Sequence, residues 1–186
     1  MGSLMTEIVA PPFREFSKIP RLSRQMIVTE KIDGTNGVVY VGEDDLVLPG
    51  SPSRWLTPEQ DHFGFAAWVK EHEANLRLLG PGYHFGEWWG EGIQRGYGIK
   101  GKRWSLFNVK RWGTLRPECC HVVPVLYEGP FDTVVVEKCL LSLATFGSQA
   151  STNFMRPEGV VVYHVAGGYL FKKTLEKDDA PKGGDS

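Results

Sequence analysis

The stretch that decides the fold is Thr29-Glu30-Lys31-Ile32-Asp33-Gly34-Thr35-Asn36-Gly37. Apolar, β-branched segments at 26–30 and 37–41 flank its central turn, so the pattern predicts two strands with Lys31 between them. A lysine held in an acidic, glycine-ended turn can serve as a covalent nucleophile. The alternative is an ordinary surface lysine, and so short a string recurs so easily that other segments must decide.

An amine has to be uncharged before it can act as a nucleophile. At the ordinary lysine pKa of ~10.4, about one amine in 2,500 is neutral at pH 7, a scarcity equivalent to roughly 4.6 kcal/mol. A catalytic lysine therefore needs desolvation or a nearby cation. Residues that could supply such surroundings are the features to look for in the rest of the chain.

The composition indicates one globular domain with a sizeable core, because 41% of the 186 residues are hydrophobic and 12% are aromatic. No apolar run approaches the roughly 18 residues of a membrane span, and the N-terminus lacks the features of a signal peptide. Three cysteines form neither a disulfide framework nor a zinc spacing, so we expect a cytoplasmic protein with no membrane contact. The net charge of −1 disfavours nonspecific binding to nucleic acid, although the basic, aromatic segment 100–112 could form a local binding face or a solvated strand edge.

Hydrophobic periodicity predicts a single α+β domain over residues 1–175, with a disordered tail at 176–186. The longest helix is expected to begin after the N-cap Thr57, to continue to residue 79 and to cover a sheet. A second helix is expected at 132–146, and residues 49–54 are expected to form a loop. Further strands are expected at 83–88, 104–109, 121–126, 159–165 and 169–174, of which the last two form a hairpin.

Several later side chains are candidates for the same site as the lysine. Glu87 is a carboxylate inside an aromatic strand, where it must accept hydrogen bonds or face a ligand such as a sugar hydroxyl. Phe107 could stack on a purine or lie in the core. Glu158 precedes a buried strand and either binds a cation or is a solvated strand-end charge. Lys172 and Lys173 must point to opposite faces of the last strand, so only one of them is expected to reach the site.

The order of these motifs resembles that of the covalent nucleotidyltransferases, which include polynucleotide ligases and mRNA capping enzymes. The shared order is a nucleophilic lysine, Ser53-Arg54, Phe85-Gly86-Glu87, Leu106-Phe107, the segment 157–162 and lysines in a final strand. The K-x-D-G-T-N string at 31–36 is most similar to that of the ATP-dependent RNA ligases, and the resemblance covers about residues 20–175. It implies an adenylation domain of two antiparallel-rich sheets with flanking helices and a nucleotide pocket between the sheets.

The resemblance also implies roles for the residues that match these motifs. Lys31 would attack the α-phosphate of ATP and carry AMP through a phosphoramidate bond. Glu30 would contact adenine, and Phe107 would stack on the same base. Arg54 would reach the ribose or a phosphate, and Glu87 would bind the ribose hydroxyls.

A divalent metal, Mg²⁺ or Mn²⁺, is part of the same resemblance, which implies that Glu158 and Asn36 hold its waters. A dication near the lysine would also favour the neutral amine. Lys172 would bind the α-phosphate. The family usually ends on K-x-K, but Thr174 stands here in the second position, so either one phosphate contact is missing or Lys173 takes it in a shifted register.

These motifs favour an ATP-dependent RNA ligase that joins the 5′-phosphate and 3′-hydroxyl ends of RNA through lysyl-AMP and an adenylylated 5′ end. We expect no OB-fold or other C-terminal domain, so RNA binding would rest on the surface of this domain or on a protein partner. The alternatives are a DNA ligase core, a capping-type guanylyltransferase, a subunit that only adenylylates itself, and a non-catalytic nucleotide- or nucleic-acid-binding module. Intact Lys31, Glu87 and Glu158 weigh against the non-catalytic alternative.

Overall fold

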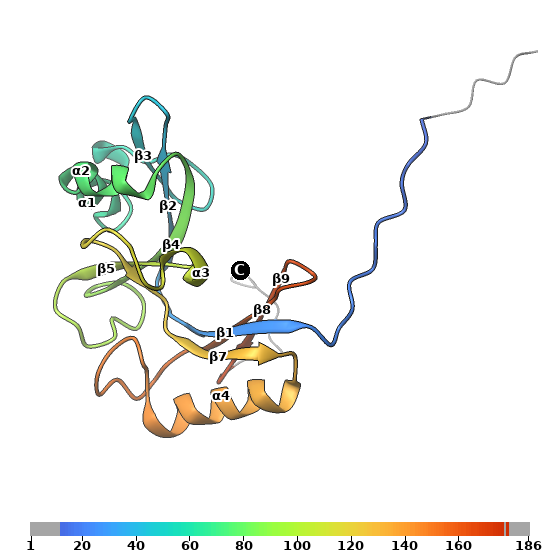
Figure 1. Ribbon diagram of the computed structural model, residues 1–186. Helices are drawn as coiled ribbons and strands as arrows, with labels where there is room; N and C mark the ends of the chain where they lie inside the picture. The colour runs from blue at the N-terminus through green and yellow to red at the C-terminus, as the bar shows by residue number, and fades with distance from the viewer. Residues whose placement is uncertain (1–11, 177, 179–186) are drawn as a thin grey trace, which may run out of the picture.

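The computed structural model describes residues 12–176 and residue 178, and these residues form two β-sheets that meet at an angle (Figure 1). This is the expected α+β arrangement of two antiparallel-rich sheets with flanking helices. The tail predicted at 176–186 lies, apart from Glu176 and Asp178, outside the described residues, as do residues 1–11 of the predicted domain. None of the helices formed by the described residues has the length and apolarity needed to cross a membrane.

The first sheet has four strands in the order β7-β1-β8-β9, and every neighbouring pair is antiparallel. Its strands are β1 (Gln25–Lys31), β7 (Val125–Pro130), β8 (Gly159–His164) and β9 (Tyr169–Thr174). Side chains alternate across a strand, so Val28 and Glu30 of β1 point to one face while Thr29 and Lys31 point to the other. The first of these faces carries the core, and the second faces the other sheet.

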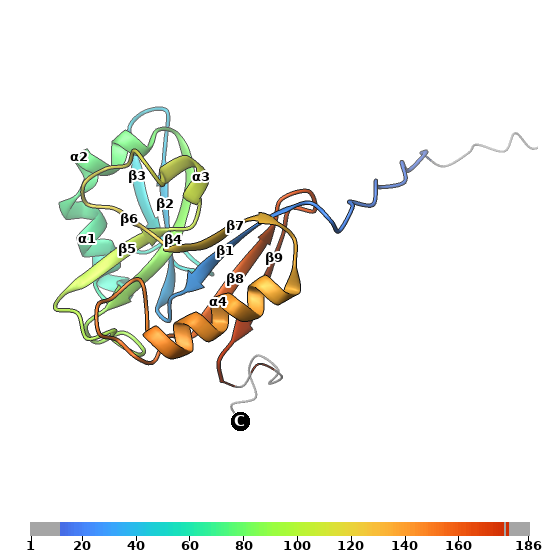
Figure 2. The same cartoon turned by 60° about the horizontal axis from the view of Figure 1, so that its bottom comes forward.

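Helix α4 (Thr133–Phe146) covers the core face of the four-stranded sheet (Figure 2). The carboxylate of Asp132 accepts a hydrogen bond from the amide of Val134 and so caps the first turn. The helix ends at Gly147, whose φ of 84° is a conformation that favours glycine. The buried residues between helix and sheet are Met26, Val28, Val136, Cys139, Leu140, Leu143, Val160 and Val162. This is the helix that the sequence predicted at 132–146.

The second sheet has five strands in the order β3-β2-β4-β5-β6, antiparallel except for the last pair. Its strands are β2 (Thr35–Val41), β3 (Val47–Gly50), β4 (Gly82–Gly90), β5 (Lys102–Leu106) and β6 (His121–Val122). Its core contains the fully buried rings of Phe65, Trp88 and Trp104. The loop predicted at 49–54 is wrong in its first residues, because Pro49 and Gly50 complete β3 by pairing with β2.

The long helix predicted at 57–79 is also wrong, because the chain forms four short pieces there. They are η1 (Pro58–Gln60), α1 (Phe65–Glu71), α2 (Glu73–Leu76) and η2 (Arg77–Leu79). Phe63 and Gly64 have φ values of 51° and 79°, which no right-handed helix can contain. The helix α1 begins after them, and Asp61 stabilises its first turn because the Asp61 carboxylate accepts hydrogen bonds from the amides of Ala66 and Ala67. The longest helix of the described residues is therefore α4.

Two predicted strands need correction because their ends belong to other elements. The strand expected at 104–109 ends at Leu106, and α3 (Val109–Trp112) follows because the Asn108 side chain accepts a hydrogen bond from the amide of Arg111. The strand expected at 121–126 is divided between β6 and β7, which lie in different sheets. Between them the amide of Val123 bonds to β5, and the carbonyl of Pro124 accepts from the amide of Glu30.

The turn at residues 32–34 also carries the chain from one sheet to the other. β1 ends at Lys31 in the four-stranded sheet, and β2 begins at Thr35 in the five-stranded sheet. Gly34 leaves no room for a side chain here, because an added Cβ would lie 2.5 Å from the Trp88 carbonyl oxygen. The chain segment that holds the lysine is thus clamped at the junction of the two sheets.

Candidate active site

A cavity of about 680 Å³ lies between the two sheets, with walls contributed by both. Most of the predicted site residues line it: Glu30, Lys31, Asn36, Glu87, Phe107 and Lys172. A second cavity, of about 560 Å³, lies beside α4 and β9. Of the predicted residues it includes only Lys172 and Lys173, so the cavity between the sheets is the candidate active site.

Lys31 and Glu158 form the central contact of this site. Lys31 is the last residue of β1 and pairs with Gly159 of β8, which brings the preceding residue, Glu158, beside it. The Nζ atom of Lys31 donates a hydrogen bond to Oε2 of Glu158 at 2.5 Å. The two side chains are 25% and 18% exposed, so the ion pair is largely withdrawn from water.

Arg95 fixes the position of this pair, and the sequence analysis did not identify it. Its Nε atom bonds to Asp33 Oδ2 at 2.9 Å, and its Nη1 atom donates to the carbonyl oxygens of Arg156 and Pro157 at 3.0 and 3.3 Å. One guanidinium therefore joins the turn after Lys31 to the segment before Glu158. The only sequence signal was a charged residue within a glycine-rich connection.

Tyr97 supports the same turn, and the sequence analysis did not identify this residue either. Its ring is fully buried, and its hydroxyl oxygen accepts a hydrogen bond from the amide of Asp33 at 2.9 Å. Burial raises the pKa of this hydroxyl, so it stays protonated. The tyrosine is therefore a neutral, rigid support for the backbone that follows the lysine.

Glu87 lies on β4 directly opposite Asn36 of β2 and is only 8% exposed. Its Oε1 atom accepts a hydrogen bond from the amide of Gly34 at 3.0 Å. Burial raises the pKa of this carboxyl from 4.5 to about 7, and the charge of Lys31 and the Gly34 hydrogen bond only partly oppose this rise. Near neutral pH the group exists in both forms, so it can accept hydrogen bonds and, when protonated, donate one.

Glu30 points away from its neighbour Lys31, toward the loop that follows α4. Its carboxylate accepts hydrogen bonds from the Ser148 hydroxyl at 2.5 Å and from the amides of Gln149 and Ala150 at 2.7 and 3.0 Å. Burial raises the pKa of Glu30, although these hydrogen bonds oppose the rise. Glu30 is part of the cavity wall, but its carboxylate holds the 148–150 loop in place.

The remaining predicted residues divide into two groups. Phe107, which is 40% exposed, and Lys172 line the cavity. Lys173 points to the opposite face of β9, where its Nζ atom lies 3.0 Å from Glu137 of α4. Arg54 is exposed outside the cavity, and its guanidinium donates to Gln60 Oε1 at 3.0 Å. The structure thus brings most of the predicted residues together around the cavity and places Arg54 and Lys173 away from it.

The oxygen ligands around the cavity suit a hydrated divalent metal. Glu158 and Asn36, the residues predicted to hold the metal, offer one carboxylate and one amide oxygen, and Glu87 lies directly opposite Asn36. Within residues 12–176 and 178, no three His, Cys, Asp or Glu side chains gather into a ready-made metal site. Mg²⁺ tolerates such a set, because it keeps several waters and uses one or two carboxylates together with substrate phosphates. The residues present therefore fit Mg²⁺, or Mn²⁺ with the same oxygen ligands.

Solved structures identify the class of this fold. An RNA ligase mutant from Naegleria gruberi with ATP and Mn matches with a TM-score of 0.60 and 19% identity, over 82% of this chain and 50% of that chain. Another mutant of that ligase, with AMP and Mn, gives 0.59 and 20% over 81% and 49% of the two chains. The chain spans about half the length of these structures. They define the nucleotidyltransferase-type fold of RNA ligases.

The family itself follows from the sequence match. The model of the RNA ligase family matches residues 24–174, which include both sheets and every residue of the candidate site. The chain therefore belongs to the RNA ligase family. No curated protein matches it.

Proposed function

We propose that this chain is an ATP-dependent RNA ligase that works through a covalent lysyl-AMP. The observation that carries this proposal is the contact of Lys31 with Glu158 beside a cavity between two sheets. A cavity of about 680 Å³ falls in the range of small-molecule sites. The Naegleria structures with ATP or AMP and Mn support the same ligands here.

In the first step, the Nζ lone pair of Lys31 forms a bond to the α-phosphorus of ATP. The bond from this phosphorus to the bridging oxygen breaks, and pyrophosphate leaves. Before the attack Glu158, whose Oε2 atom lies 2.5 Å from Nζ, accepts one proton from the Lys31 ammonium and so frees the lone pair; the second proton, which the nitrogen loses as the bond to phosphorus forms, passes to solvent. Such a transfer depends mainly on positioning and on the neutralisation of phosphate charge, which the rigid turn and its cations supply.

The other residues of the cavity bind and orient the nucleotide. Phe107 stacks on the adenine, and Glu87 binds the ribose hydroxyls. Lys172 places its positive charge at the α-phosphate. Glu158 and Asn36 would hold the waters of Mg²⁺ or Mn²⁺, and the positive charge of the bound ion would neutralise phosphate charge and favour the uncharged amine.

The later steps use RNA. An oxygen of a 5′-phosphate end attacks the phosphorus of lysyl-AMP, and the Lys31 nitrogen leaves, so that AMP passes to the RNA. The 3′-hydroxyl of a second end then attacks the 5′-phosphorus, and AMP leaves as the ends are joined. We propose that the two-sheet domain is the unit that carries out all three transfers.

Labelling with ATP tests this proposal directly. The protein is incubated with α-labelled ATP or GTP and with Mg²⁺ or Mn²⁺, and the label that survives a denaturing gel is counted. Wild type and the control Lys70→Ala, which removes a lysine that is 77% exposed on α1, should take up label from ATP, and Lys31→Ala should take up none. The label should be released by acid, as expected of a phosphoramidate.

Three outcomes would point elsewhere. An unlabelled wild type, or equal labelling of Lys31→Ala, would contradict the role of Lys31. Label from GTP alone would indicate a capping-type guanylyltransferase. Sealing of nicked or single-stranded DNA in preference to RNA would indicate a DNA ligase core.

A further inference from the structure

Four aromatic side chains, three exposed and one half-buried, form a continuous row on the five-stranded sheet. The row consists of Tyr40 on β2, Trp55 after β3, and Tyr83 and Phe85 on β4. Ring centroids lie 4.8 Å apart for Tyr40 and Tyr83, 6.2 Å for Trp55 with each tyrosine, and 6.3 Å for Tyr83 and Phe85. Trp55, Tyr83 and Phe85 are 47%, 59% and 54% exposed, so large ring surfaces face solvent.

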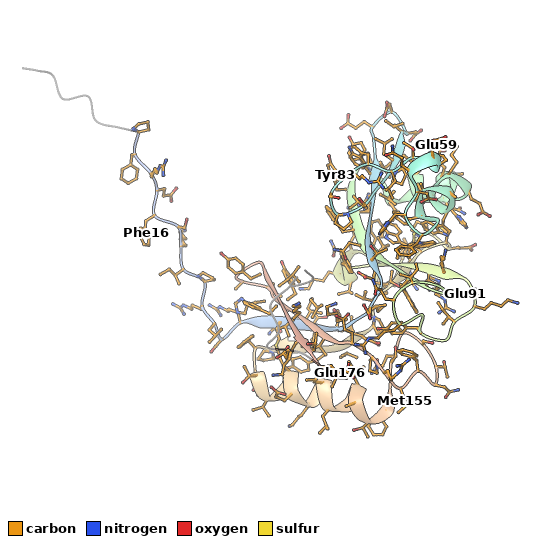
Figure 3. The ribbon with its side chains drawn as sticks, turned by 180° about the vertical axis from the view of Figure 1, so that it is seen from behind. Phe16, Glu59, Tyr83, Glu91, Met155 and Glu176 are labelled. Carbon is orange, nitrogen blue, oxygen red and sulfur yellow. The ribbon has the colours of Figure 1, made fainter. Side chains whose placement is uncertain are left out.

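The aromatic row leads into the candidate active site. Tyr83, Phe85 and Glu87 are every second residue of β4, so their side chains lie on the same face of the sheet, and Glu87 lines the cavity. The amide of Phe107, another cavity residue, donates to the carbonyl of Phe85 at 3.0 Å. Figure 3 shows Tyr83 on the side of its sheet that faces the open angle of the molecule. From Glu87 to Tyr83 the strand advances about 13 Å, room for roughly two to four nucleotides.

Charge around the row is suited to a polyanion. Lys110 and Lys172 line the cavity at one end, and exposed Arg54 directly precedes Trp55 at the other. The acidic residues nearby in sequence are those of the turn 43–45, Glu59 of η1, and Asp61, whose carboxylate is bound by the amides of Ala66 and Ala67. The rings themselves offer flat π-faces, on which any base can stack without a sequence preference.

We propose that the aromatic row binds the bases of a single-stranded RNA end that is delivered to Lys31. This inference rests on the proposed function, because a ligase must guide a polynucleotide end to its adenylylated lysine. Single-stranded RNA fits the row better than a duplex does, since only unpaired bases expose both faces for stacking on aromatic side chains. Stacking on the row allows the domain to bind RNA without relying on the net charge of the protein.

Binding of a short, 5′-phosphorylated single-stranded RNA without ATP tests the row. Anisotropy of a labelled oligonucleotide gives the affinity of wild type, Tyr83→Ala and Phe85→Ala. Each alanine variant should bind roughly 5- to 150-fold more weakly, the range expected for the loss of one stacked base. Tyr83→Phe keeps the ring and should bind like wild type, as should Phe146→Ala, which removes a ring that is 79% exposed at the end of α4.

An abasic oligonucleotide separates stacking from phosphate binding. It should bind wild type at least as weakly as the base-containing RNA binds Tyr83→Ala, because it loses every stacked base rather than one. Equal affinity of wild type for both oligonucleotides would overturn the proposal, and so would unchanged affinity in both alanine variants. Loss of RNA affinity only in proportion to a lower melting temperature would assign the rings to stability instead, and capture of a folded protein without RNA affinity would make the row a protein interface.

The failure of this inference differs from the failure of the proposed function. If wild type forms lysyl-AMP but the row variants bind RNA normally, the row is not the RNA site and the ligase proposal stands. If RNA binding depends on the row but no lysyl-AMP forms, the ligase proposal fails and the row stands.

Discussion

Replacing Glu87 with Gln tests the electrostatics of the cavity most directly. The carboxyl is 8% exposed, and its pKa rises from 4.5 to about 7, mainly through burial. The difference between these values corresponds to about 3 kcal/mol. Because the folded protein binds this proton more tightly than the unfolded chain does, the contribution of Glu87 to stability is fully present below pH 4.5 and is lost as the pH rises through about 7.

Glutamine stays neutral at every pH and keeps an oxygen that can accept the hydrogen bond from the Gly34 amide. We therefore expect Glu87→Gln to match wild type near pH 5 and to be more stable by up to about 3 kcal/mol at pH 8.5. Urea unfolding at pH 5, 7 and 8.5 measures this difference. In a chain of this size the same effect would raise the melting temperature by about 6–12 °C at high pH.

The control is Glu71→Gln on α1, which removes an exposed carboxylate and should show no such pH dependence. A stabilisation of equal size at pH 5 and 8.5 would refute the reasoning, because it would not come from ionisation. Formation of lysyl-AMP by Glu87→Gln should fall at least tenfold. Higher stability with lower activity would show that the carboxyl is kept for function at a cost in stability.

Three further predictions concern charge and space around the lysine. Lys172→Ala should lower lysyl-AMP formation at least tenfold. Lys173→Ala should change the free energy of unfolding by less than ~1 kcal/mol, as expected for a half-exposed ion pair. Equal labelling of the two variants would contradict the placement of these lysines on opposite faces of β9. Gly34→Ala should lower the free energy of unfolding by about 1–3 kcal/mol, because its Cβ would meet the Trp88 carbonyl oxygen, and an unchanged urea midpoint would exclude this clash. Arg95→Ala should raise the metal concentration needed for labelling, with partial recovery in Arg95→Lys, whereas a lower melting temperature alone would indicate a merely structural role.

Local patterns were sufficient for elements whose signals lie within the element. The α4 helix follows from the Asp132 cap, its apolar face and Gly147, and the hairpin of β8 and β9 follows from its alternation and glycine turn. The helix predicted at 57–79 failed because two residues, Phe63 and Gly64, adopt left-handed conformations inside a good helical pattern. The strand at 121–126 failed because its two halves pair with remote strands, and pairing partners are not written in a local pattern.

The sequence by itself determined the lysine, its turn and the order of the motifs, and these are enough to indicate the RNA ligase family. Only the tertiary structure decided which side chains meet. It set Glu158 against Lys31 across 127 positions, turned the Glu30 carboxylate toward the 148–150 loop, and brought Arg95 between the turn and Pro157. The physical reason is that strand register and packing between sheets are fixed by contacts between distant segments, whereas a motif records only the neighbours of a residue along the chain.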